Sequence, residues 1–378
     1  MSTETTRRAW AYLSRVAEPP CALLRELVAT EGPVVAARMI WQQKEPAELT
    51  ALVAGRRGVD RSAADLEFLA GRGGRLLTPD DDEWPYLAFQ SFDSAVAEPT
   101  REAVAPLVLW VLGPARLDEV AERAVAIVGT RASTAYGDTL AADFAAGLVD
   151  TDMAVVSGAA YGIDGAAHRS ALACSGVTVA VLAAGLDVPY PAGHSALLHR
   201  ISQTGALVTE YPPGVRPARY RFLTRNRLVA ALSRTTVVIE AGLRSGAAST
   251  AAWARLLGRP VCAVPGPVTS AASAGCHEML RAGAAELVTR AEHVVELAGS
   301  CGELAEDPEH PSTELDGLGD VERRVYEALP GRGGASIEDI ALGAALPPEQ
   351  VIGPLALLEL AGLVENREGR WRLRRSNK

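Results

Sequence analysis

The chain has 378 residues, of which 48% are hydrophobic and 22% are charged, and its formal net charge is -9. This composition excludes a wholly disordered protein, and the length accommodates two or three domains. No stretch reaches the roughly 18 apolar residues of a membrane span, and the first residues lack the apolar segment of a signal peptide. The five cysteines are widely spaced without a C-x-x-C pair, which predicts free thiols in a reducing compartment. We therefore expect a cytoplasmic protein with no membrane span.

The N-terminal segment is predicted to be a small helical module. Apolar residues recur at three- and four-residue spacing from Arg7 to about Gln43, and a further helical piece covers 63–70. A glycine-rich turn at 71–74 ends the module. We assign residues 1–75 to an N-terminal helical, SAM-like domain, for which packing, oligomerisation and DNA binding all remain open as roles.

A repeated order of strand, glycine-rich turn and helix follows. Short apolar runs between 76 and 120 predict an edge strand or hairpin. Apolar strands are then expected at 124–129, 153–158, 177–185, 206–211, 235–241, 260–266 and 285–289, with helical stretches in nearly every gap. Continuous apolar strands with intervening helices predict a mostly parallel sheet covered on both faces. The fold class expected for residues 76–299 is therefore a doubly wound, Rossmann-like α/β domain.

The C-terminal part divides into a linker and a small domain. Residues 301–320 contain seven acids and no Lys or Arg, so we assign 300–319 to a flexible acidic linker. Residues 320–378 show three short helical stretches and a hairpin, the pattern of a winged helix. The expected recognition helix, 347–363, carries two acids and no base, which favours protein contact over entry into a DNA groove. Residues 367–378 hold six positive charges, which leaves phosphate contacts open for the wing and tail.

Positive charge is concentrated between Arg216 and Arg259, where nine arginines face one acid, Glu240. Such asymmetry in an acidic chain predicts a polyanionic partner. The planar fork of Arg grips phosphate through two hydrogen bonds, which favours phosphate recognition over a merely solvated helix face.

Several strand-to-helix turns are rich in small residues, which let backbone N–H groups approach an anion at a helix N-terminus. They contain Gly129 and Arg131, Ser157 and Gly158, residues 183–186, and Arg244-Ser245-Gly246. Loops at the carboxyl ends of parallel strands are where open α/β sheets bind ligands. Neither G-x-G-x-x-G with a ribose-binding acid nor G-x-x-x-x-G-K-[ST] is present, so we expect no NAD or ATP cofactor.

Candidates for catalysis are few. Asp164 and His168 share one helix face, and we favour a helix-terminal acid near a structural or surface His over a catalytic pair. A metal would need a third ligand at matching spacing, and the other histidines do not supply it. Glu240 is a candidate base at the end of an apolar strand, although orienting an arginine or a backbone amide is favoured. We expect no catalytic residue and no metal, and hence a protein that is not an enzyme.

Six motifs, in this order, resemble those of the DNA-processing protein A (DprA, also called Smf) family. They are IVGTR (127–131), SGAAYGIDGAAH (157–168), TVAVLAAGLDVPYP (178–191), TRNRLVAALS (224–233), VVIEAGLRSGAASTA (237–251) and AVPGPV (263–268). The resemblance implies a Rossmann-like domain that binds single-stranded DNA and forms a homodimer. It also implies that the protein protects incoming DNA and helps to load a RecA-type recombinase in DNA uptake and recombination.

The resemblance also selects residues. Arg131 matches the Arg of the family's G-[ST]-R turn, Arg225, Asn226 and Arg227 match its R-N-R, and Arg244 stands where the family commonly has Lys. The expected nucleic-acid-binding residues are Gly129, Arg131, Ser157, Gly158, Tyr161, Arg225, Asn226, Arg227, Arg244, Ser245 and Gly246. Base stacking would need aromatic residues such as Tyr161, Tyr220 or Phe222. The remaining arginines of the cluster, at 216, 219, 221, 234, 255 and 259, are expected to be surface charge.

Two other functions are alternatives. One is a nucleotide-binding or phosphoribohydrolase-type enzyme with Glu240 as base, but the P-G-G-x-G-T-x-x-E motif of such enzymes is absent, and the nearest turn reads AGLRSGAAST (241–250). The other is a transcription factor whose winged helix reads duplex DNA, and the acidic recognition helix argues against it.

Overall fold

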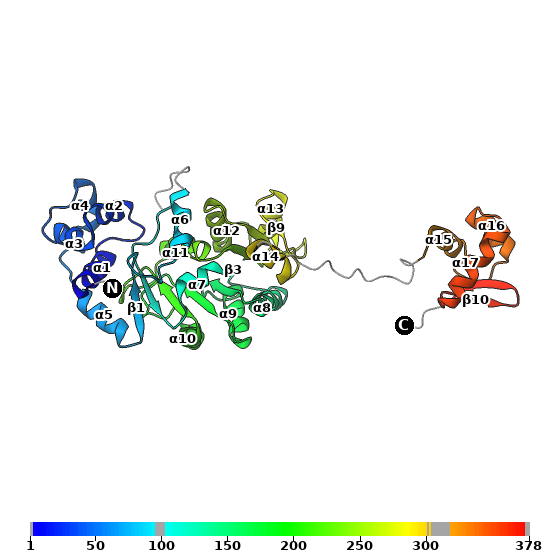
Figure 1. Cartoon of the computed structure of the whole chain (residues 1–378), viewed down its shortest axis with the longest axis horizontal. Helices are drawn as coiled ribbons and strands as arrows, with labels where there is room; N and C mark the ends of the chain where they lie inside the picture. Colours follow the sequence, from blue (N-terminus) through cyan, green and yellow to red (C-terminus); the bar gives the residue numbers. More distant parts are fainter. Residues whose placement is uncertain (1–2, 95–102, 301, 304–317, 375–378) are drawn as a thin grey trace. The chain divides into compact units, whose positions relative to one another are not determined.

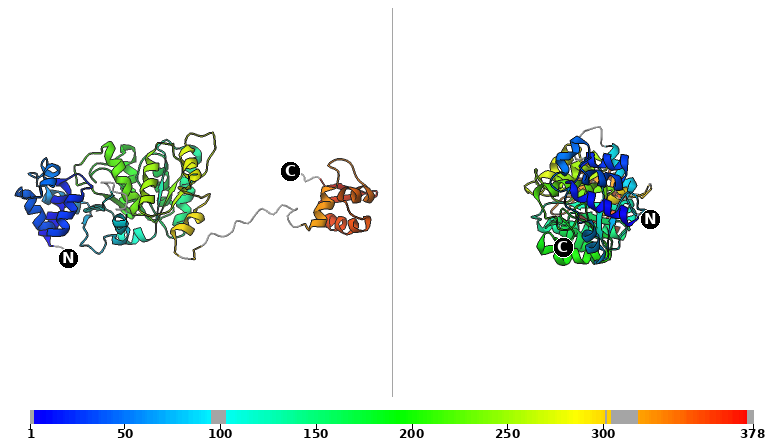
Figure 2. Two further views of the ribbon diagram at one scale, coloured as in Figure 1. Left: turned by 90° about the horizontal axis from the view of Figure 1, so that it is seen from above. Right: turned by 90° about the vertical axis from the view of Figure 1, so that its left-hand side faces the viewer.

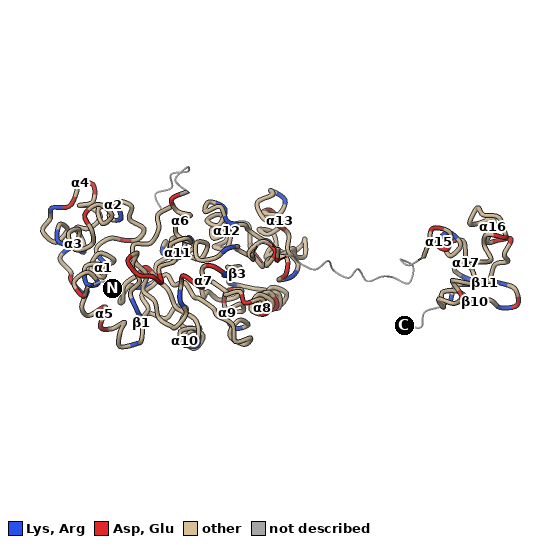
Figure 3. Tube along the Cα trace, viewed as in Figure 1, with Lys and Arg blue, Asp and Glu red and all other residues tan. Residues whose placement is uncertain are grey.

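The computed structural model describes residues 3–94, 103–300, 302–303 and 318–374. The chain divides into two compact units, residues 1–305 and 306–378 (Figure 1). Most of the expected acidic linker at 300–319 lies outside the described residues. Basic and acidic residues are interspersed along the trace of the first unit (Figure 3), so the predicted positive site must arise from local side-chain placement.

Five helices open the first unit. They are α1 (Glu4–Val16), α2 (Ala22–Glu31), α3 (Pro33–Trp41), α4 (Ala47–Val53) and α5 (Ser62–Ala70). Their apolar side chains share one core with Leu76, Val108 and Trp110 at the edge of the sheet. The boundary expected at residue 75 therefore falls inside a compact unit, within strand β1 (Gly74–Leu77).

The centre of the first unit is a sheet in the order β1-β2-β6-β5-β4-β3-β7-β8-β9. β2 (Leu109–Leu112) pairs antiparallel with both β1 and β6, and the remaining neighbours are parallel. The parallel strands are β3 (Ala124–Val128), β4 (Ala154–Ser157), β5 (Thr178–Val181), β6 (Ala206–Thr209), β7 (Thr235–Val238), β8 (Val261–Ala263) and β9 (Glu286–Leu287). The seven predicted parallel strands and the predicted edge strand are confirmed.

Helices cover both faces of this sheet (Figures 1 and 2). They are α6 (Tyr86–Ser94), α7 (Leu117–Glu122), α8 (Ala135–Asp150), α9 (Ile163–Ala173), α10 (Ser195–Thr204), α11 (Arg219–Ala231), α12 (Gly246–Leu256), α13 (Ala274–Arg281) and α14 (Ala291–Ala298), with a short 3-10 helix at Ala192–His194. Successive residues of a strand point to opposite faces. Accordingly Ala126 belongs to the core beneath α11 and α12, and Ile127 to the core beneath α8, α9 and α14.

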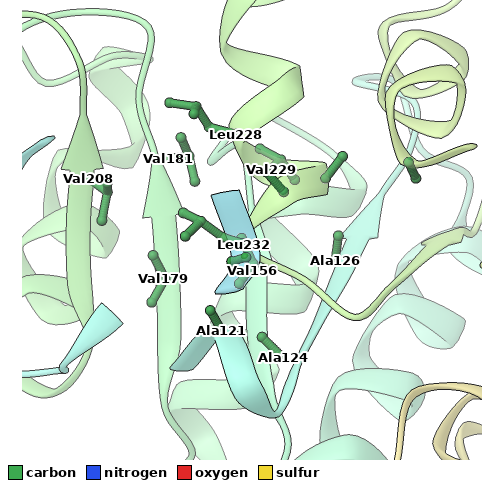
Figure 4. Packing of buried hydrophobic residues seen from close by; sticks show 14 of the residues in the cluster. Ala121, Ala124, Ala126, Val156, Val179, Val181, Val208, Leu228, Val229 and Leu232 are labelled. Carbon is green, nitrogen blue, oxygen red and sulfur yellow. The ribbon is translucent and has the colours of Figure 1, made fainter. Parts of the chain in front are cut away.

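The core beneath α11 shows how this helix is seated. Leu228, Val229 and Leu232 point toward the valines of β4 and β5 (Figure 4). Because both faces of the strands β3 to β8 are buried, these strands are mostly apolar, with buried Ser and Thr at a few positions. The doubly wound α/β fold is confirmed.

The second unit contains α15 (Asp320–Glu327), α16 (Ile337–Ala344), α17 (Pro348–Leu360) and an antiparallel hairpin of β10 (Val364–Arg367) and β11 (Arg370–Leu373). Ser336 and Asp339 form a capping box at the start of α16. Three helices followed by a hairpin are the elements predicted for a winged helix, an assignment that stays a prediction. Among the described helices, none is by itself long and apolar enough to cross a membrane; α16 and α17 reach that threshold only as a pair bent by 101°.

Candidate nucleic-acid interface

The candidate site lies at the carboxyl ends of β3 and β7, neighbouring strands between which the chain order reverses. From β3 the chain continues through β4, β5 and β6 on one side, and from β7 through β8 and β9 on the other. The connections after β3 and β7 therefore diverge to opposite faces of the sheet, and ligands of open α/β sheets bind in the crevice so formed. A groove of about 760 Å³ lies at this position.

Four arginines and one acid line this groove, which we call the arginine groove. Arg131 follows β3, Arg244 follows β7, Arg219 and Arg225 come from α11, and the acid is Asp164. The side chains of Arg131, Arg219 and Arg244 are exposed. No carboxylate among the described residues pairs with any of the three. Their charge is therefore available to an anion.

Arg225 supplies a fixed charge at the floor of the groove. It is 5% exposed, and its Nη1 donates to the carbonyl of Val181 at 2.7 Å. Burial lowers the pKa of Arg225 to about 10, against the opposing effect of the Asp164 carboxylate, so the guanidinium stays charged at neutral pH. Gly158 makes room for it, because a Cβ there would lie 1.9 Å from Nη1.

Glu240 organises the loop after β3. It is 1% exposed, its Oε2 accepts from the backbone N–H of Thr134 at 2.9 Å, and its Oε1 accepts from the Thr134 hydroxyl at 2.6 Å. The Thr134 hydroxyl in turn accepts from the N–H of Gly137 at 3.1 Å and caps α8. Both carboxylate oxygens are engaged, so the favoured role of Glu240, orienting a backbone amide, is confirmed.

Two helices begin at the arginine groove. Ser245 caps α12 by accepting from a backbone N–H at 3.2 Å, and the side-chain amide of Asn226 donates to the carbonyl of Gly246 at 3.2 Å. Gly162, at φ +73°, directs the loop after β4 against the carbonyl of Thr130, where a Cβ would lie 2.3 Å away. The N-termini of α9 and α12 add the positive ends of their dipoles to the arginine charges.

An apolar recess opens beside the groove, and we call it the aromatic recess. It is lined by Tyr161, Tyr190, Phe222 and Arg131 among others. The Phe222 ring lies 5.2 Å from the Tyr190 ring and 5.3 Å from Cζ of Arg131. Tyr161 is 48% exposed and contacts the His194 ring edge-on at 4.8 Å. Aromatic faces beside arginines are the arrangement on which unpaired bases stack.

Most of the predicted site residues come together here. The arginine groove contains Gly129, Arg131, Gly158, Arg225, Asn226, Arg244, Ser245 and Gly246, and Tyr161 lines the adjoining recess. Ser157 does not reach the groove, because its hydroxyl is fully buried and donates to the carbonyl of Ile127 at 2.6 Å. The predicted contact of Ser157 with nucleic acid is therefore corrected.

The predicted contact of Arg227 with nucleic acid is also corrected. Its side chain is 0% exposed, and its Nη2 lies 2.6 and 2.5 Å from the two carboxylate oxygens of Glu210. Residues two apart on a helix point in different directions, so Arg225 faces the groove while Arg227 enters the core beside Phe92. Arg227 stabilises the position of α11 and does not reach the groove.

Arg219 was expected to be surface charge, but it lines the arginine groove. Arg219 and Asn226 are seven residues apart, which places them on one face of α11. This spacing could have identified Arg219 from the sequence. Arg221, by contrast, pairs with Glu18, which lies in the loop after α1, with 2.6 Å between Nε and Oε1.

The structural role expected for His168 is confirmed. Its ring is fully buried, and its Nδ1 lies 2.7 Å from the Thr178 hydroxyl. Burial lowers the pKa of His168 to about 3, so the ring is neutral at physiological pH. Asp164, at the start of the same helix, lines the groove next to Arg225.

Comparison with known proteins gives a consistent result. Residues 75–299 match the model of the family described as DNA recombination-mediator protein A. A putative DNA processing protein DprA of Mycobacterium tuberculosis is 66% identical over 373 residues, which cover 99% of this chain and 96% of that protein. Protein Smf of Escherichia coli is 38% identical over 67% of this chain and 68% of its own length. The crystal structure of DNA processing protein A from Streptococcus pneumoniae superposes with a TM-score of 0.63 and 27% identity, covering 78% of this chain and 98% of that one.

Proposed function

This chain belongs to the DNA recombination-mediator protein A family, and on that premise we propose that it binds single-stranded DNA in the arginine groove. One observation carries the proposal: four arginines from three separate segments converge on a groove that adjoins an aromatic recess. Arginines neutralise phosphates, and every base offers a face for stacking, so binding is expected to depend on salt and to tolerate any sequence.

Each segment has a distinct part in this proposal. Arg131 and Arg244 line the groove from the turns after β3 and β7, where each binds a backbone phosphate through its planar fork. Arg219 extends the positive rim along α11, and Arg225 supplies an immobile charge below the strand. Bases that flank the bound phosphates stack on Tyr161 or Phe222 in the aromatic recess.

We also propose that the protein protects and delivers DNA without catalysing a chemical change in it. The two acid–base candidates are used structurally, because both oxygens of Glu240 bind Thr134 and His168 is buried against Thr178. In this role a homodimer in the cytoplasm holds incoming single-stranded DNA and helps to place a RecA-type recombinase on it. The family's description as a recombination mediator supports that assignment.

The test is a titration of a labelled single-stranded oligonucleotide by fluorescence anisotropy at several salt concentrations. Arg131→Ala and Arg244→Ala are each expected to weaken binding and to lower the slope of log K against log salt by about 0.7, the value for one phosphate contact on a single strand. Arg200→Ala is the matched control, because Arg200 is an exposed arginine on α10 that does not line the groove. Unchanged affinity of the Arg131→Ala, Arg244→Ala double variant would overturn the proposal.

Competition on the same sample separates the alternatives. Single-stranded DNA is expected to displace the probe at lower concentration than duplex DNA or a nucleoside monophosphate. Tighter binding of duplex DNA would favour the transcription factor, and tighter binding of the monophosphate would favour a nucleotide site.

A further inference from the structure

A second surface with the chemistry of a nucleic-acid contact lies on the N-terminal helices. A hollow of about 320 Å³ is bounded by α1, α3 and the segment that enters α5. It is lined by Trp41, the last residue of α3, and by Arg8 and Arg38 from α1 and α3. We call it the Trp41 hollow.

The indole of Trp41 is both fixed and open. Its ring centroid lies 6.0 Å from that of Tyr12 in an edge-on contact, and the Tyr12 hydroxyl donates to the carbonyl of Arg57 at 2.7 Å. Yet Trp41 is 54% exposed, whereas Trp10, Trp84 and Trp110 are buried in the cores. A large aromatic side chain that is held in place but left open is suited to stacking with a flat ligand.

The charges around the Trp41 hollow are not neutralised internally. Arg8 and Arg38 are exposed, and no carboxylate among the described residues pairs with either. Other arginines of these helices are paired, namely Arg7 with Asp81, Arg15 with Asp65, Arg56 with Glu18 and Arg57 with Glu45. The acid of the hollow, Asp60, accepts a hydrogen bond from the N–H of Ser62 at 2.9 Å at the entry to α5. Two free guanidinium groups thus flank one open indole.

We propose that the Trp41 hollow is a second contact for single-stranded DNA, in which a base stacks on Trp41 while neighbouring phosphates pair with Arg8 and Arg38. This inference rests on the proposed function, since it adds a contact outside the arginine groove for the same ligand. Both sites belong to the first unit, and in this proposal one long strand contacts both. An aromatic face between two cations fits a base with its flanking phosphates.

The experiment compares a short oligonucleotide of about 6 nucleotides with a long one of about 40, on the full-length protein, bracketing the site sizes of single-strand binding modules. Trp41→Ala is expected to weaken binding of the long strand about fivefold or more, the effect of losing one stacked base. Trp41→Phe restores most of the affinity because it keeps an aromatic face. The short strand, held in the arginine groove, binds all three proteins equally.

The two arginines are tested by the salt dependence. Arg8→Ala with Arg38→Ala is expected to lower the slope of log K against log salt for the long strand by about 1.4, as two lost phosphate contacts require. Leu52→Ala is the control for Trp41, because Leu52 is also 54% exposed on these helices but lies outside the hollow. Arg200→Ala is the control for charge.

The outcomes distinguish the two proposals. Unchanged binding of the long strand by the Trp41 and arginine variants overturns the inference, while loss of binding in the Arg131→Ala, Arg244→Ala variant still supports the groove. If the unmodified protein binds neither strand, both proposals fall. A Trp41-dependent affinity for phosphorylated peptides with no Trp41 dependence for DNA would also overturn it.

Discussion

Replacing Arg227 by Met is expected to destabilise the first unit strongly without removing a DNA contact. The guanidinium is fully buried and lies 2.6 and 2.5 Å from the oxygens of Glu210, itself 4% exposed. Met keeps most of the volume but leaves a buried carboxylate without its counter-charge. Breaking one side of such a pair costs about 3–5 kcal/mol, which lowers the melting temperature by about 6–10 °C at roughly 2 °C per kcal/mol for a unit of this size.

The double variant Arg227→Met, Glu210→Leu checks the cause of this loss. Removing both charges is expected to restore most of the stability, because no buried charge remains unpaired. The loss in the single variant should also be smaller at pH 5 than at pH 8, since the orphaned carboxyl protonates more readily at low pH.

Thermal melts and urea titrations of the three proteins supply the stabilities. DNA affinity is then measured well below the melting temperature. A single variant that melts like the unmodified protein but binds single-stranded DNA tenfold more weakly would refute the reasoning and return Arg227 to the interface.

Three further predictions follow from the site. Gly158→Ala places a Cβ 1.9 Å from Nη1 of Arg225 and is expected to weaken DNA binding by about tenfold, the loss of one charged hydrogen bond. Gly55→Ala is the control, because a Cβ there meets no heavy atom within 4 Å and Gly55 lies outside the groove. Equal effects of the two changes in an anisotropy titration would contradict the assignment. Burial lowers the pKa of His168 to about 3, so the unfolded chain takes up the proton first below pH 6.5, and stability falls by about 2 kcal/mol between pH 7 and pH 5. Urea titrations should show a smaller fall in His168→Asn, and an equal fall in both proteins would exclude this cause. Glu240→Gln is expected to retain DNA binding and to lose about 1–2 kcal/mol of stability. If the unmodified protein releases base from nucleoside monophosphates and the Glu240→Gln variant does not, the protein is instead an enzyme.

The periodicity of the sequence predicts the elements of the fold but not their order in space. Mostly apolar runs such as 124–129 and 235–241 correspond to β3 and β7, because strands buried on both faces favour apolar residues at most positions. That β3 and β7 are neighbours is not encoded in either run. It depends on the return of the chain to β3 after it has formed β4, β5 and β6, and it is this adjacency that creates the arginine groove.

The sequence was less informative about the direction of individual side chains. Charge and motif both pointed to α11, but they did not separate Arg225, which faces the groove, from Arg227, which faces the core. The difference is set by the phase of the helix and by Glu210, which the preceding β6 places in the core. Since the helix begins at Arg219, five residues before the motif 224–233, one more arginine reaches the groove than the motif indicated.

The ion-paired arginines of α11, Arg221 and Arg227, help to keep the groove-lining arginines of the same helix in position. Arg227 ties the helix to Glu210, just after β6, and Arg221 ties it to Glu18, in the loop after α1. Arg15 of α1 reaches the same region, donating to the carbonyl of Pro213 at 2.7 Å. These two ion pairs hold α11 in place and with it Arg219 and Arg225, and a site that is already ordered loses less entropy when it binds. The N-terminal helices therefore help to position α11 beside the groove, and they belong to the same compact unit as the sheet.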